Sequence, residues 1–108
     1  MGLFDFLRRP ERPDMGAELE RFRSTPGAVL LDVRTPEEYA AGHIPGSRNV
    51  PLDELHRSEL PEDPGTPLFV CCLSGARSRQ AALLLRQAGY SDVTDLGGIQ
   101  HYHGKVVR

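Results

Sequence analysis

Residues 72–78, which read Cys-Leu-Ser-Gly-Ala-Arg-Ser, combine a thiol with groups that bind anions. A thiolate is a strong nucleophile, and a short loop before a helix can direct several backbone N–H groups towards one point. Gly75 admits backbone conformations closed to other residues, and Arg77 carries a forked cation that suits an oxyanion. The segment therefore predicts Cys72 as a nucleophile beside an anion-binding loop. The predicted substrate-binding residues are Leu73, Ser74, Gly75, Ala76, Arg77 and Ser78.

The chain has only two cysteines, Cys71 and Cys72, and they are adjacent. This arrangement excludes a scaffold built on several disulfides. A cysteine at the end of a strand commonly acts as a small hydrophobic residue, and this is the simplest interpretation of Cys71. For Cys72, the glycine and the arginine that follow favour a role as a nucleophile over a role as a small hydrophobic residue.

Composition and charge restrict the class of protein. The 108 residues are 39% hydrophobic and 26% charged, which indicates one globular domain rather than a disordered chain. The net charge of −2 gives no basic field that would indicate nucleic acid as a partner. The longest apolar runs, such as residues 81–85, are too short for a transmembrane segment.

The first residues lack the order of a secretion signal, because Arg8 and Arg9 follow the apolar residues instead of preceding them. We therefore expect a cytoplasmic protein whose thiols are reduced. Two prolines among charged residues then indicate a linker. The expected organisation is an N-terminal arm and linker over residues 1–13, followed by a domain over residues 14–108.

Hydrophobic spacing and capping residues predict helices that alternate with strands. Asp14 is a suitable N-cap for a first helix, and Thr35 with Glu38 makes a capping box at the start of a second. The apolar run 28–33 is too continuous for a half-exposed strand and predicts a strand covered on both faces. The predicted helices are 15–23, 36–42 and 76–88, with a helical turn at 52–55. The predicted strands are 28–33, 48–50, 68–71 and 93–96, with a turn at Gly97 and Gly98.

This alternation implies an α/β fold with a small parallel sheet and helices on both faces. Ligands of such sheets bind beyond the carboxyl ends of the strands, which is where Cys72 lies. Adjacent strand residues point to opposite faces, so Cys71 is expected to point away from Cys72. The residues of the helix 76–88 expected to pack on the sheet share one face: Ala81, Leu84, Leu85 and Ala88.

Two distant segments carry a resemblance to a known family. The first reads Leu-Asp-Val-Arg-Thr-Pro-Glu-Glu-Tyr over residues 31–39, with Gly-His-Ile-Pro-Gly-Ser over 42–47. The second is the loop 72–78, followed by Leu-Gly-Gly-Ile over 96–99. In this order the segments resemble the single-domain rhodaneses, a sulfurtransferase family. The resemblance extends over about residues 14–107 and implies a rhodanese-like three-layer α/β sandwich.

The resemblance also implies an activity. Cys72 would take the outer sulfur of thiosulfate or of a persulfide donor, hold it as a covalent persulfide, and pass it to a thiol or to cyanide. It implies no cofactor and no metal, and it admits a protein persulfide as a partner. Arg77 would hold the sulfonate of the donor, while Asp32 and Arg34 would form a polar brace near the edge of the site. One departure is Tyr102, which stands where the family commonly has tryptophan.

Other functions remain open. Counted from Cys71, the chain reads Cys-x5-Arg-Ser, the signature of phosphatases, and an arsenate reductase belongs with this alternative. The loop glycine lies three residues after Cys72, and Val70 stands where protein tyrosine phosphatases have histidine, so Cys72 is favoured. A non-catalytic rhodanese-like binding module is a third interpretation, and the presence of Cys72 argues against it. A metal site from Cys71, Cys72, His101 and His103 is disfavoured, because adjacent thiols should point to opposite faces.

Overall fold

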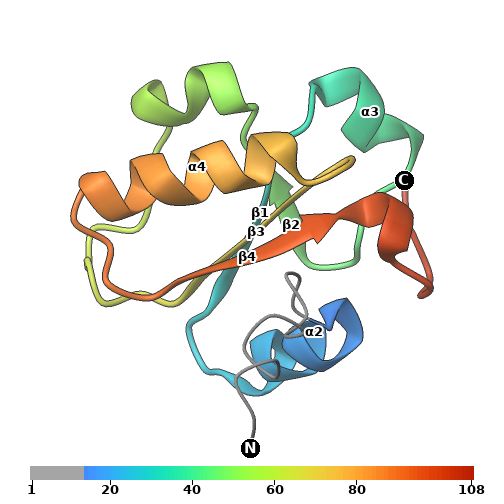
Figure 1. Ribbon diagram of the computed structural model, residues 1–108, viewed down its shortest axis with the longest axis horizontal. Coiled ribbons are helices and arrows are strands. Elements are labelled where there is room, and N and C mark those ends of the chain that lie inside the picture. The colour runs from blue at the N-terminus through green and yellow to red at the C-terminus, as the bar shows by residue number, and fades with distance from the viewer. Residues whose placement is uncertain (1–13) are drawn as a thin grey trace, which may run out of the picture.

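The computed structural model describes residues 14–108, and its centre is a four-stranded parallel sheet (Figure 1). The strand order is β2-β1-β3-β4. The strands are β1 (Val29–Asp32), β2 (Ser47–Asn49), β3 (Leu68–Cys72) and β4 (Val93–Gly98). The predicted α/β fold with a small parallel sheet is therefore confirmed. The arm and linker expected over residues 1–13 lie outside the described residues.

Helices cover both faces of this sheet. Helix α2 (Met15–Ser24) lies on one face, and α4 (Ala76–Gln87) lies on the other, together with the 3-10 helix η1 (Leu52–Arg57) (Figure 1). Two short elements complete the fold: α3 (Pro36–Ala41) after β1, and the 3-10 helix η2 (Ile99–His101) after β4. The three-layer arrangement expected from the alternation of helices and strands is therefore present.

The two central strands are covered on both sides, as their apolar sequences predict. All five residues of β3 are buried. Alternate residues contribute to two separate cores, because successive side chains of a strand point to opposite faces. The core on the α4 side contains Leu31, Val33, Val50, Leu55, Leu68, Val70, Cys72, Ala81 and Leu85. The core on the α2 side contains Met15, Leu19, Leu30, Ile44, Phe69, Cys71 and Leu96.

Local capping starts the first two helices where the sequence predicts. The carboxylate of Asp14 accepts hydrogen bonds from the N–H groups of Gly16 and Ala17 at the start of α2. At the start of α3, Thr35 Oγ1 accepts from the N–H of Glu38, and Glu38 Oε1 accepts from the N–H of Thr35. This reciprocal pair is the predicted capping box, and it holds the Glu38 carboxylate in one place.

The register aligns the carboxyl ends of three neighbouring strands. Asp32 of β1 is paired with Cys71 of β3, and Cys72 of β3 is paired with Gly98 of β4. The chain leaves the sheet at the same edge after each of these residues. Residues that are far apart in the sequence therefore meet at this edge, as the topology of a parallel sheet requires.

Two details differ from the sequence-based expectations. Gly97 and Gly98 do not form a turn but belong to β4. Leu84, expected on the packed face of α4, is 41% exposed, and Ala88 is also exposed. The buried stripe of α4 instead consists of Ser78, Ala81, Ala82 and Leu85. This stripe keeps the helical spacing, but it places three small side chains against the sheet and leaves Leu84 at the side of the helix.

No helix within residues 14–108 is long and apolar enough to cross a membrane. This finding agrees with the short apolar runs of the sequence.

Gly98 of β4 lies directly against the loop that follows β3. A Cβ atom at this position would lie 2.3 Å from the carbonyl oxygen of Leu73 and 2.7 Å from Cα of Ser74. These are backbone atoms, so one of the two segments would have to move to admit a side chain. The absence of a side chain at Gly98 thus permits the loop to lie against β4.

We predict that Gly98→Ala lowers the free energy of unfolding by roughly 1–3 kcal/mol, the usual range for overpacking a tight site. Urea denaturation measures this change. Gly16→Ala is the matched control, because a Cβ there would meet only Asp14 Oδ1 at 3.5 Å. The control should unfold at the same or a higher urea concentration than the wild type. Equal stability of Gly98→Ala and the wild type would contradict the close approach.

Candidate active site

Cys72 is the last residue of β3 and has 1% of its surface exposed. Its Sγ atom accepts a hydrogen bond from the backbone N–H of Gly75 at 3.0 Å. Gly75 has φ +114°, in the left-handed region that only glycine adopts without strain. The chain thus curls back immediately after the strand, and this curl directs a backbone N–H at the sulfur.

The same glycine is the N-cap of α4, a helix of 12 residues. The first i→i−4 bond of this helix runs from the N–H of Arg79 to the carbonyl of Gly75. The N–H groups of residues 76–78 therefore have no acceptor inside the helix, and they carry the positive end of its dipole. An anion at the end of β3 would meet these N–H groups.

The remaining loop residues have different environments. Leu73 is 41% exposed, and Ser74 and Ala76 are also exposed. Ser78 is fully buried, and its hydroxyl donates to the carbonyl of Gly75 at 3.1 Å, so its side chain stabilises the turn. The N–H of Gln100 donates to the carbonyl of Leu73 and links the loop to the segment after β4. The substrate-binding roles of these residues stay predictions.

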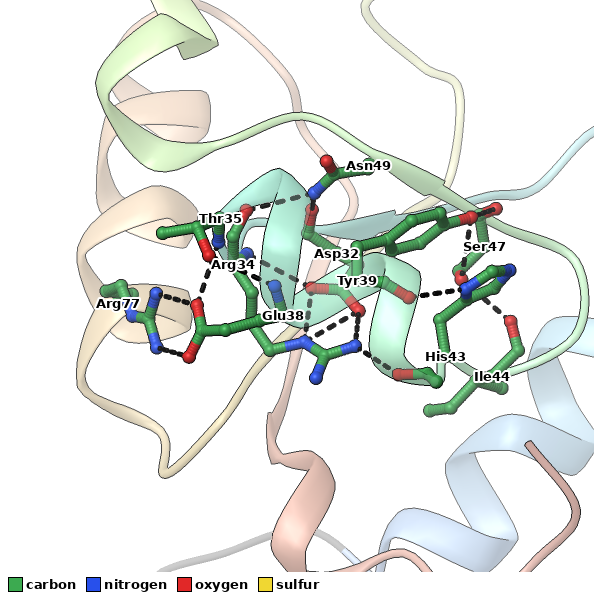
Figure 2. Close-up of polar contacts among 11 residues, drawn as sticks. Asp32, Arg34, Thr35, Glu38, Tyr39, His43, Ile44, Ser47, Asn49 and Arg77 are labelled. Carbon is green, nitrogen blue, oxygen red and sulfur yellow. Dashed lines mark hydrogen bonds and ion pairs between the residues drawn. The ribbon is translucent and has the colours of Figure 1, made fainter. Parts of the chain in front are cut away.

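Arg77 makes an ion pair with Glu38 of α3 (Figure 2). Arg77 Nη1 lies 2.7 Å from Glu38 Oε1, and Arg77 Nη2 lies 3.0 Å from Glu38 Oε2. The hydrogen bond with Glu38 raises the pKa of Arg77. The hydrogen bonds from Arg77 and from the Thr35 N–H lower the pKa of Glu38 to about 2. Both ends of the guanidinium fork are therefore engaged by an ionised carboxylate.

The sequence indicates Glu38 only as part of the capping box, and the ion pair with Arg77 is not expected from it. The two residues are 39 positions apart, and no periodic pattern connects them. Their contact depends on the parallel topology, which places the start of α3 beside the start of α4. The only signal in the sequence is that each residue follows a predicted strand, and that the two strands end at the same edge of the sheet.

Asp32 and Arg34 form a second ion pair, which is buried (Figure 2). Arg34 Nη2 lies 2.8 Å from Asp32 Oδ2, and Arg34 Nε lies 2.9 Å from Asp32 Oδ1. Arg34 also donates to the carbonyl of Gly42, while the side-chain amide of Asn49 donates to the carbonyls of Asp32 and Arg34. These contacts link the ends of β1, α3 and β2 beside the site, where a polar brace is expected from the sequence.

Cys71 has no exposed surface and belongs to the core on the α2 side. Cys72 belongs to the core on the α4 side, so the two thiols point to opposite faces of the sheet. Burial raises the pKa of the Cys71 thiol, and the nearby Asp32 carboxylate adds to this effect. A protonated and enclosed thiol is a poor nucleophile. This environment weighs against a phosphatase that uses Cys71.

The candidate metal ligands and two aromatic residues of the fold, Tyr102 and His43, also bear on the expectations from the sequence. Within residues 14–108, no three His, Cys, Asp or Glu side chains are grouped so that they could hold a metal ion. Tyr102 packs against the core on the α2 side, and its hydroxyl donates to the carbonyl of Lys105 at 2.6 Å. His43 is stacked on the ring of Tyr39, with centroids 3.7 Å apart.

A family model described as a rhodanese-like domain matches residues 15–105. The chain belongs to the rhodanese-like family. A protein named thiosulfate sulfurtransferase GlpE from Ectopseudomonas mendocina is 42% identical over 72 residues, which are 67% of this chain and 66% of that protein. A protein named sulfurtransferase from Allochromatium vinosum is 40% identical over 81 residues, which are 73% of this chain and 74% of that protein.

A solved structure agrees with this assignment to the rhodanese-like family. The human single-domain sulfurtransferase TSTD1 superimposes with a TM-score of 0.66 at 33% sequence identity. The superposition covers 76% of this chain and 85% of the human one. The alignment with GlpE spans just under two thirds of that protein.

We predict that Asp32→Ala lowers the free energy of unfolding by about 3–5 kcal/mol, because it leaves the Arg34 guanidinium buried without its carboxylate. Thermal or urea unfolding measures this loss. The control is Glu18→Ala, which breaks the exposed pair between Glu18 and Arg21 and should change stability by at most about 1 kcal/mol. If the two variants lost similar free energies of unfolding, the buried pair between Asp32 and Arg34 would not stabilise the ends of the strands as we describe.

Proposed function

We propose that the protein is a sulfurtransferase that moves sulfane sulfur through a persulfide on Cys72. The single observation that carries this proposal is the N–H of Gly75 directed at Cys72 Sγ, at the positive end of α4. Support also comes from relatives named thiosulfate sulfurtransferase and sulfurtransferase. The donor is thiosulfate or a persulfide, and the acceptor is a thiol or cyanide. A protein persulfide is a further possible donor.

The first half of the reaction loads the cysteine. The Cys72 thiolate attacks the outer sulfur of thiosulfate, a new S–S bond forms, and the bond between the two sulfur atoms of thiosulfate breaks. Sulfite leaves with the electron pair of that bond. With an alkyl persulfide as donor, the corresponding thiolate leaves instead. The product is a Cys72 persulfide with one negative charge on its outer sulfur, close to the N–H groups of the loop.

The second half unloads the cysteine. A nucleophilic acceptor attacks the outer sulfur, and the Cys72 thiolate is regenerated as the leaving group. Cyanide is converted into thiocyanate, and a thiol is converted into a persulfide. Because the enzyme alternates between two covalent forms, ping-pong kinetics are expected. The sulfur is carried by the cysteine itself, so the proposed chemistry uses no cofactor.

We infer roles for most of the predicted site residues. The N–H of Gly75 and those of residues 76–78 would stabilise the thiolate and the persulfide, which is electrostatic stabilisation by oriented dipoles. The Arg77 guanidinium would bind the sulfonate of thiosulfate once it leaves Glu38. Asp32 and Arg34 would hold the ends of β1 and α3 in place.

We predict that Cys72→Ala abolishes the formation of thiocyanate from thiosulfate and cyanide, because no other thiol lies at the end of β3 facing the loop. Mass spectrometry of the wild type after incubation with thiosulfate should show one added sulfur atom on Cys72. Cys71→Ala is the matched control and should retain most of the activity. Full activity in Cys72→Ala would refute the assignment. If only Cys71→Ala lost activity and the wild type hydrolysed an aryl phosphate, the phosphatase alternative would be favoured.

We also predict that Arg77→Ala raises the KM for thiosulfate by about fivefold, through loss of a charged hydrogen-bond donor for the sulfonate. The free energy of unfolding should change far less. Arg79→Ala removes an exposed arginine two residues further along α4, and its KM should equal that of the wild type. An unchanged KM in Arg77→Ala would show that this residue does not bind thiosulfate.

A further inference from the structure

The only charged side chain of the loop, Arg77, is held by a carboxylate from another element. Both Nη atoms of Arg77 contact the carboxylate of Glu38, one oxygen each. About a third of each side chain is exposed, so the pair lies at the surface and is open to solvent. The pair is oriented end-on, and this geometry uses the two donors that would otherwise bind an oxyanion in the same forked manner.

The position of Glu38 does not depend on Arg77. Its Oε1 atom also accepts a hydrogen bond from the N–H of Thr35 at 2.8 Å, as part of the capping box of α3 (Figure 2). The carboxylate would therefore stay at the rim of the site even if Arg77 moved away. Its pKa of about 2 keeps it ionised at neutral and mildly acidic pH.

A second carboxylate lies in the same region. Thr35, Asp53 and Arg77 line a surface hollow of about 400 Å³ between α4 and the start of η1. With Arg77 neutralised by Glu38, Asp53 leaves a net negative charge among the residues that line this hollow. A donor with two negative charges must displace Glu38 from the guanidinium and remain close to a fixed carboxylate, which is unfavourable.

We propose that Glu38 is a specificity-determining residue, which competes with dianionic donors for Arg77 and so favours donors that carry a single negative charge. Thiosulfate belongs to the disfavoured class, and alkyl persulfides belong to the favoured class. This inference rests on the proposed sulfurtransferase function and specifies its donor. Glu38 acts by occupying the guanidinium, and it does not touch the reacting sulfur.

Glu38→Gln is the decisive variant, because glutamine also serves in a capping box and thus preserves the start of α3. It removes the charge that holds Arg77. The measurement is the second-order rate constant for persulfide formation on Cys72, followed by quenched-flow mass spectrometry. The two donors are thiosulfate and the persulfide of 2-mercaptoethanol. We expect the constant for thiosulfate to rise about threefold, the size expected for release of one partly exposed ion pair. The constant for the alkyl persulfide should change little.

Two controls separate competition from other effects. Glu37→Gln removes an exposed negative charge from the neighbouring position of α3 and should leave both constants unchanged. In an Arg77→Ala background, Glu38→Gln should raise the thiosulfate constant less than it does in the wild type, because the guanidinium for which Glu38 competes is absent and only the repulsion by the carboxylate is removed. A purely structural role of Glu38 would instead affect both donors equally, and its effect would have the same size in the Arg77→Ala background.

The outcomes distinguish this inference from the proposed function. If the wild type forms a persulfide with at least one donor but Glu38→Gln leaves the thiosulfate constant unchanged or lowers it, the competition is refuted and the sulfurtransferase stands. A decrease would mean that Glu38 positions Arg77 for the donor. An equal increase with both donors refutes donor selection. If the wild type forms no persulfide with either donor, the proposed function fails, and this inference fails with it.

Discussion

Successive residues of a buried strand must point to opposite faces of a sheet, and this constraint gives two adjacent thiols different environments. Cys72 faces the α4 side at the point where β3 ends, beside the N–H groups of the loop. Cys71 faces the other core and has no exposed surface. The central position of β3 in the sheet, with neighbours on both sides, prevents the strand from rotating to exchange them.

The loop after β3 is formed by contacts from three directions. Gly75 supplies the left-handed turn, the hydroxyl of Ser78 bonds to its carbonyl, and the absence of a side chain at Gly98 leaves room for residues 73 and 74. These three residues come from the loop, from α4 and from β4. The geometry around the sulfur is thus determined by backbone conformation, and it needs only small side chains.

Local signals made most of the fold predictable. The capping residues Asp14 and Thr35 locate the starts of two helices, and the continuous apolar runs locate the two central strands. The expectations that were wrong concern features that depend on tertiary packing. Gly97 and Gly98 suggest a turn locally, but hydrogen bonding to β3 places them in a strand. The face of α4 that packs on the sheet is the one whose small side chains allow a close approach.

The candidate site was predictable to a similar extent. Cys72 and the loop could be singled out because their residues are contiguous. The ion pair between Glu38 and Arg77 could not, because it joins two helix starts through the three-dimensional arrangement of the strands. The pair formed by Asp32 and Arg34 was predictable only in part. They are two residues apart, so the resemblance could name both, but their bonds to Gly42 and Asn49 follow only from the folded sheet.

The enclosure of Cys71 has a consequence for the lifetime of sulfur held on Cys72. A persulfide that becomes protonated on its outer sulfur has an electrophilic inner sulfur, and a thiolate on the next residue would attack it, release hydrosulfide and close a strained ring between neighbours. Burial keeps the Cys71 thiol protonated and on the far side of the sheet. In a protein that carries sulfur on Cys72, this separation protects the cargo from self-discharge until an external acceptor arrives.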